Sequence, residues 1–231
     1  MRRTGLRWIM FALGISIIAA CSGRESTKTS TSESPAGVGT GGAGANKDAK
    51  EFVRDVAMMN MAEIELSRMA LEKATSPEIK TFAQTIIDDH TAAGDKLKSI
   101  TSGQSMEWPS QLDEKRRKAA DELATKQGTD FERDYAEAMV EGHQDLTALL
   151  ESRLDVQSLS EWKTAAAGRA QSKVMPDPKA EMGDVKVRPA KSDTDSAMKI
   201  NQWAADTYPV AQKHLDTARA LETATKKRST D

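Results

Sequence analysis

The chain has 231 residues, of which 29 % are charged and 4 % aromatic, and its formal net charge is −2. This balance argues against a nucleic-acid-binding protein, and the scarcity of aromatic residues argues against a β-sandwich. The length fits one domain or two small ones, and the many Ala, Glu, Lys, Leu and Met residues favour helices.

The chain begins with the features of a bacterial lipoprotein signal, predicted over residues 1–20. A basic segment, MRRTGLR, precedes an apolar segment, WIMFALGISIIAA, which ends at Cys21, the only cysteine of the sequence. The tetrad Ile18-Ala19-Ala20-Cys21 resembles a lipobox, and this resemblance implies a diacylglycerol on Cys21. An ordinary secretory signal that ends at a cysteine is the alternative. Ser22 favours the outer membrane, so we expect a lipid anchor there, a globular part in the periplasm and no membrane-spanning helix.

Residues 21–47 are rich in Ser, Thr and Gly and are predicted to form a disordered tether, because they cannot bury a core. A helical domain is predicted over residues 48–226, with a frayed tail at 227–231. Its first helix is expected from about Asp48 to Thr75. Ser76 and Pro77 are typical of a helix start, and the second helix should continue to Ile100 and pack against the first as an antiparallel hairpin.

Three further helices are predicted after a loop. A short one, with Ser110 as its cap, should end at Gly128. A capping box from Thr129 to Glu132 should open a long helix that reaches about Leu154. The segment 155–191 is expected to be an irregular insertion with some helix, and the last helix starts at about Asp193. The predicted fold is therefore all-α: an up-down four-helix bundle with one extra short helix.

Four ionisable residues stand where these helices should face the core, among apolar residues spaced by three and four. Each lies near the middle of its helix, so the sequence predicts one polar layer across the bundle. These four residues are Glu63, His90, His143 and His214.

Two interpretations of this layer remain open. Imidazole and carboxylate suit Zn, Fe, Mn or Cu, so the four residues are candidate ligands of a mononuclear metal site. The Glu-x-x-His motif of di-iron bundles is absent, because Ile87 precedes His90 by three and Ala211 precedes His214 by three. The alternative is a structural layer, in which Glu63, Asp89, Glu141 or Tyr135 supplies hydrogen bonds. Asp88 or Asp89 could assist His90, and a run at Met58, Met59 and Met61 suggests copper but is more typical of core packing.

Three segments are similar to the bacterial domain-of-unknown-function family 4142: FVRDVAMMNMAEIELSRMALEKATSPEIKTFAQTIIDDHTAAGDKL, FERDYAEAMVEGHQDLTALLE and PVAQKHLDTARAL, with the blocks DDH, EGHQ and KHL in this order. The similarity covers roughly Lys50 to Leu221, with 155–191 as an insertion. The resemblance implies a ferritin-like helical fold and an exported or outer-membrane location, and it transfers no activity.

No Ser-His-Asp order, P-loop, CxxC or HExxH motif appears in the sequence, and we identify no catalytic residue. We therefore expect a lipid-anchored envelope protein with a non-enzymatic binding or envelope-maintenance role and no cofactor. The alternative is a periplasmic metal-binding protein or metal-dependent oxidoreductase. The membrane is the one partner that the sequence indicates, and no protein partner can be named.

Overall fold

The computed structural model describes residues 41–170 and 185–228, and this part contains six helices and no strand. The predicted all-α fold is confirmed. The predicted signal, Cys21 and most of the predicted tether lie outside the described residues. None of the described helices is long and apolar enough to cross a membrane. The helices are α1 (Gly41–Lys73), α2 (Pro77–Ile100), α3 (Glu114–Ala124), α4 (Gly128–Glu151), α5 (Val156–Ala170) and α6 (Asp195–Arg228).

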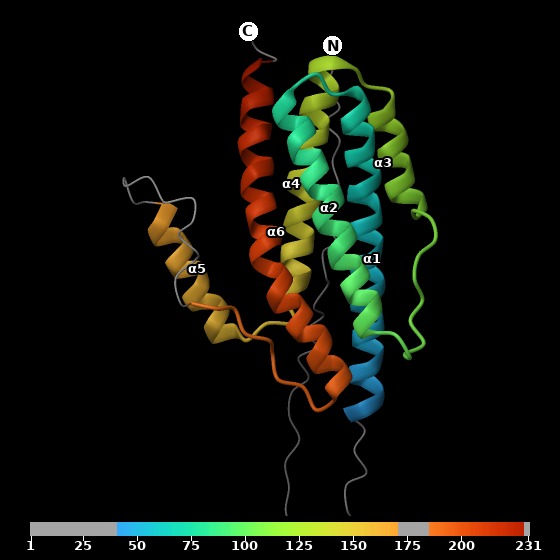
Figure 1. Ribbon diagram of the computed structural model, residues 1–231, viewed down its shortest axis with the longest axis vertical. Coiled ribbons are helices and arrows are strands. Elements are labelled where there is room, and N and C mark those ends of the chain that lie inside the picture. The colour runs from blue at the N-terminus through green and yellow to red at the C-terminus, as the bar shows by residue number, and fades with distance from the viewer. Residues whose placement is uncertain (1–40, 171–184, 229–231) are drawn as a thin grey trace, which may run out of the picture. The chain divides into compact units, whose positions relative to one another are not determined.

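The four long helices form the bundle, in which α1 packs on α2 and α4, and α6 packs on α2 and α4. Helices α1 and α6 run in one direction, and α2 and α4 run in the other (Figure 1). The order therefore differs from a simple alternation of up and down, because α3 leads the chain back along the outside of α1 before α4 begins. Helix α5 lies to the side of the bundle (Figure 1).

The buried apolar side chains divide into two clusters, one toward each end of the bundle. The first includes Phe52, Val56, Leu97, Leu146 and Ala211. The second includes Leu66, Ile86, Met139 and Leu215. On each long helix, the predicted polar residue falls between a member of one cluster and a member of the other. The polar layer therefore separates the two halves of the core.

Helix α1 begins seven residues before the predicted start, so the last part of the predicted tether, Gly41–Lys47, is helical. Adding residues to an existing helix costs far less than starting one, which allows this extension despite Gly41, Gly42 and Gly44. Helix α6 continues to Arg228, beyond the predicted end. In the same helix Tyr208 and Ala211 occupy the core-facing side, whereas Val210 is 41 % exposed.

Two predicted helix starts are wrong in their details. Asp113, not Ser110, caps α3, because its carboxylate accepts the backbone N–H of Arg116 at 2.8 Å. Gly128 does not end that helix but begins α4 at a φ of 52°. The predicted capping box does not form, because Glu132 turns instead to the α1–α2 connection.

The predicted irregular insertion is more ordered than expected within the residues described. It contains the fifteen-residue helix α5. Its far end is tied back to the chain after α4 by two backbone hydrogen bonds, from Asp155 N–H to Arg188 O at 2.9 Å and from Ala190 N–H to Arg153 O at 2.8 Å. Val187 is buried, and Trp162 packs edge-on against Tyr208. These contacts anchor both sides of the segment to the bundle.

Candidate metal centre

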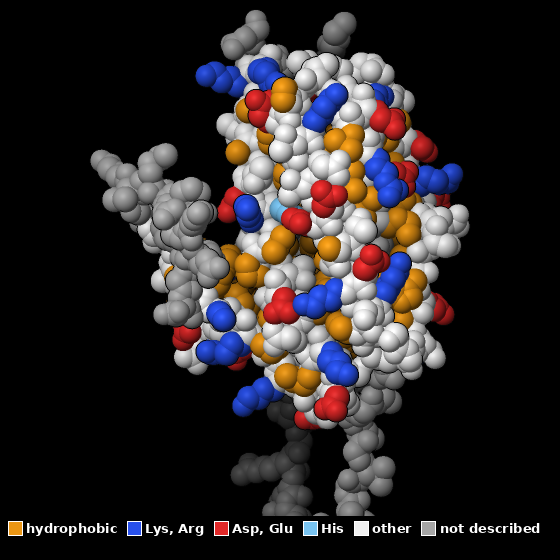
Figure 2. Space-filling model, viewed as in Figure 1, with side chains coloured by type: hydrophobic (Ala, Val, Ile, Leu, Met, Phe, Trp, Pro, Cys, Tyr) orange, Lys and Arg blue, Asp and Glu red, His pale blue; other side chains and the backbone are white. Residues whose placement is uncertain are grey.

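The structure brings the four predicted residues together in the middle of the bundle, one from each long helix. Glu63 comes from α1, His90 from α2, His143 from α4 and His214 from α6. Their exposed fractions are 3 %, 4 %, 0 % and 4 %. The centroids of the three imidazole rings lie 5.3 to 5.6 Å apart. Figure 2 shows one histidine edge at the surface, beside charged side chains of both signs.

One nitrogen of each of two histidines is fixed by a partner outside the cluster. His143 Nδ1 lies 3.0 Å from the carbonyl oxygen of Met139, one turn earlier on α4. His214 Nε2 lies 2.9 Å from Asp89 Oδ2 on α2. Since a carbonyl and a carboxylate accept hydrogen bonds, these two nitrogens carry the protons of the neutral rings. The lone pairs are therefore on His143 Nε2 and His214 Nδ1, and neither atom has a hydrogen-bond partner among the described residues.

The three histidines can each offer one nitrogen so that all three atoms lie within 4.8 Å of one another. Glu63 is outside this closest set, but it borders two of its members. Its Oε2 lies 3.2 Å from His90 Nδ1, and its Oε1 lies 3.5 Å from His143 Nδ1. Neither carboxylate oxygen forms a hydrogen bond within the described part of the chain. The centre is thus a three-histidine cluster with one carboxylate against it.

Gly142 creates the space for this carboxylate. A Cβ atom at this position would lie well inside van der Waals contact of Glu63 Oε1. Glycine in the middle of a helix is less favourable than alanine by about 1 kcal/mol, so its presence within α4 indicates a close approach of another group. In the sequence, the signal for this close approach is an isolated glycine next to the core-facing His143.

The burial of these groups disfavours their charged forms. Burial raises the pKa of Glu63 to about 8, while Arg116 lowers it and Asp145 raises it to a smaller extent. Burial lowers the pKa of His143 to about 3, and the neighbouring His214 adds to the effect. The pKa of His90 is also held well below its usual value by burial. Neutral imidazole, the form that coordinates metal ions, is therefore favoured at these positions.

Two of the predicted partners, Glu63 and Asp89, do lie against histidines. Asp89 pairs with His214 and not with His90, and Asp88 accepts a hydrogen bond from Gln84 on the surface of α2. Tyr135 bonds with Ser67 instead of a histidine. Among the predicted methionines, Met59 packs against the first apolar cluster. The sequence could not pair Asp89 with His214, because these residues meet only through the packing of α2 on α6.

The fold and the centre define a class: an all-α bundle with a buried histidine cluster in its core. A family model described as "Domain of unknown function (DUF4142)" matches residues 35–174. The chain belongs to this family, as its sequence suggested. The match starts before Lys50 and stops before α6, so His214 lies beyond the matched segment. No curated protein and no solved structure gives a significant match.

Proposed function

We propose that this protein binds a divalent transition-metal ion through His90, His143 and His214, with the carboxyl group of Glu63 beside them. The observation that carries the proposal is the direction of the lone pairs. Two of the rings are oriented by a carbonyl and a carboxylate on their outer nitrogens, which is the usual arrangement around metal-binding histidines. Their other nitrogens are buried and have no hydrogen-bond partner among the described residues. One nitrogen from each of the three rings lies within 4.8 Å of the others.

A purely structural layer explains these atoms less well. Buried polar atoms in proteins are nearly always hydrogen-bonded, and those left alone cost about 1–3 kcal/mol each. Here three imidazole nitrogens and both oxygens of Glu63 have no such bond in the described part of the chain. A cation at the centre would satisfy them. The donor set suits Zn, Cu, Ni or Fe better than Mg or Ca, because imidazole is its main component.

The test is metal binding by the purified chain and by its His143→Leu variant. We expect the native protein to bind one Zn²⁺ in calorimetry and to melt at a higher temperature when Zn²⁺ is present. At a Zn²⁺ concentration one hundred times the Kd, the free energy of unfolding should rise by about 2.7 kcal/mol. Co²⁺ should give the visible spectrum of a nitrogen-coordinated ion. His143→Leu should abolish all three signals, because it removes a ligand from the fully buried position.

Asp88→Asn is the matched control, since Asp88 lies one residue from Asp89 and bonds only with Gln84 among the described residues. This variant should bind Zn²⁺ as the native chain does. A structural layer would give the opposite pattern: no metal uptake by the native chain, and a His143→Leu variant that is as stable or more stable, as for other buried polar groups replaced by apolar ones.

We further propose that the bundle is a lipid-anchored envelope protein. The support is the sequence alone: the basic and apolar segments of residues 1–20 and the tetrad that ends at Cys21. Cys21→Ser should leave the protein soluble or unprocessed, because the site of acylation is lost. The measurement is fractionation of cells that express the native chain and the variant. A variant that still sediments with the outer membrane would refute the anchor.

A further inference from the structure

A second site is indicated by a cavity of about 430 Å³ between α1 and α2. Trp108 and Pro109, from the connection between α2 and α3, also line it. Its volume is within the range of small-molecule sites. His90 forms part of its wall, but the other residues of the metal centre do not line it. The cavity is therefore a neighbour of the centre and not part of it.

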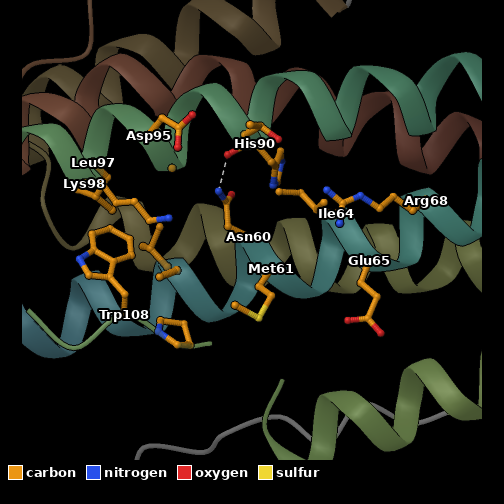
Figure 3. Close-up of a pocket in the computed structure, with 15 residues that line it drawn as sticks. Asn60, Met61, Ile64, Glu65, Arg68, His90, Asp95, Leu97, Lys98 and Trp108 are labelled. Carbon is orange, nitrogen blue, oxygen red and sulfur yellow. Dashed lines mark hydrogen bonds between the residues drawn. The ribbon is translucent and has the colours of Figure 1, made fainter. Parts of the chain in front are cut away.

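The cavity combines an apolar lining with one fixed amide. Val56, Met61, Ile64 and Leu97 are among its apolar residues. Asn60 lies between the two ends of the cavity, and its Nδ2 donates a hydrogen bond to the backbone carbonyl of His90 (Figure 3). This bond fixes the orientation of the amide.

Two cationic side chains extend into the cavity from opposite ends. Figure 3 shows the ammonium group of Lys98 and the guanidinium group of Arg68 pointing toward each other along the groove, with Asn60 and His90 between them. Neither cation has a carboxylate partner within the described part of the chain. Lys98 instead lies over the ring of Trp108, 5.3 Å from its centroid.

The carboxylates that line the cavity do not occupy the space between these cations. Glu65 points away from them, toward α3, and Asp95 stands on the α2 side (Figure 3). The space between the cationic groups is thus bordered by the side chain of Ile64 and by the amide of Asn60. A ligand that matches it has an anionic group at each end and an apolar body.

We propose that this cavity binds a small linear dicarboxylate. One carboxylate pairs with Arg68, whose guanidinium can donate two parallel hydrogen bonds, and the other pairs with Lys98. The methylene chain lies along Ile64. This site is separate from the proposed metal centre, and its occupation requires no metal ion.

The probes are succinate, glutarate, adipate and pimelate, titrated into the full chain in a calorimeter. We expect saturable binding with the highest affinity at one chain length, because both ends must reach their cations. A monocarboxylate of that length should bind about tenfold more weakly, since it loses one charge-assisted contact. Lys98→Gln and Arg68→Gln should each weaken the binding of the diacid by a similar factor.

Lys96→Gln is the matched control, because Lys96 pairs with Asp206 on α6 and does not line the cavity. This variant removes the same charge from the same helix and should bind the diacid as the native chain does. The His143→Leu variant should also bind it, so a failed metal centre and a failed dicarboxylate site give different results. Absence of binding by all four diacids, equal affinity for the monocarboxylate, or an equal loss in Lys96→Gln would overturn the proposal.

Discussion

Replacing Gly142 by alanine is expected to destabilise the bundle by about 1–2 kcal/mol and to weaken metal binding by about 10- to 100-fold. On helix propensity alone the same change should stabilise α4 by about 1 kcal/mol. The opposite sign arises because the new methyl group takes the place of Glu63 Oε1. Glu63 is 3 % exposed, so its carboxylate can move only by disturbing His90 and His143, which it borders.

A double-mutant cycle with Glu63→Ala isolates this contact. Without the carboxylate, the added methyl group meets no oxygen, so Gly142→Ala should become neutral or stabilising in the Glu63→Ala background. The measurement is urea unfolding of the four proteins, with calorimetric Zn²⁺ titration of the native chain and of Gly142→Ala. Gly168→Ala is the control, since a Cβ there has open space. A stabilising effect of Gly142→Ala in the native background would show that the carboxylate has room elsewhere.

The polar layer could be predicted from the sequence because it is a local signal repeated four times. Each core-facing side follows the spacing of its own helix, so a histidine or glutamate within it is visible without any knowledge of the neighbours. The rise of 1.5 Å per residue then places residues of different helices at similar heights. His90 and His214 could therefore be placed in one layer, although they are 124 residues apart in the sequence.

The details of the centre depend on contacts between helices and could not be predicted in this way. The spacing of the apolar residues in α2 places Asp89 on the exposed side of this helix, and only the packing of α6 on α2 gives it His214 as a partner. The space at Gly142 exists only because α1 and α4 approach each other there. The spacing of apolar residues also does not predict the direction in which α4 and α6 run, because this direction depends on the path of α3 along the bundle.

Glu132 provides the clearest case in which a tertiary contact replaces a local one. The sequence assigns it to the start of its own helix, α4, whereas the structure buries it against the α1–α2 connection. Its Oε1 accepts hydrogen bonds from the backbone N–H of Thr75 at 2.8 Å, from the Thr75 hydroxyl at 2.9 Å and from the backbone N–H of Ser76 at 2.7 Å. Its Oε2 lies 3.3 Å from the guanidinium of Arg228 on α6. One carboxylate therefore holds α1, α2 and α6 to α4 at this end of the bundle.

Glu132→Gln is expected to reduce the free energy of unfolding at pH 7 by about 2 kcal/mol, because bonds to a charged acceptor become bonds to a neutral one. Glu72→Gln is the control: Glu72 is exposed on α1 near the same connection, so its replacement should change stability by less than about 0.5 kcal/mol. Urea unfolding at pH 7 measures both variants. Equal stability of Glu132→Gln and the native chain would mean that the charge contributes nothing to this contact.

The same residue predicts how stability depends on pH. Burial alone would raise the pKa of Glu132, but the hydrogen bonds from Ser76 and Thr75 and the charge of Arg228 outweigh it and hold the pKa below the ordinary 4.5. Because the folded pKa is the lower one, its contribution is fully present above about pH 4.5 and is lost as the pH falls through the folded value. The difference in unfolding free energy between the native chain and Glu132→Gln should therefore be constant from pH 7 to 5 and shrink below pH 4.5. A difference that stays constant down to pH 3 would show that the native carboxylate does not gain a proton there, or that its charge is not what stabilises the connection.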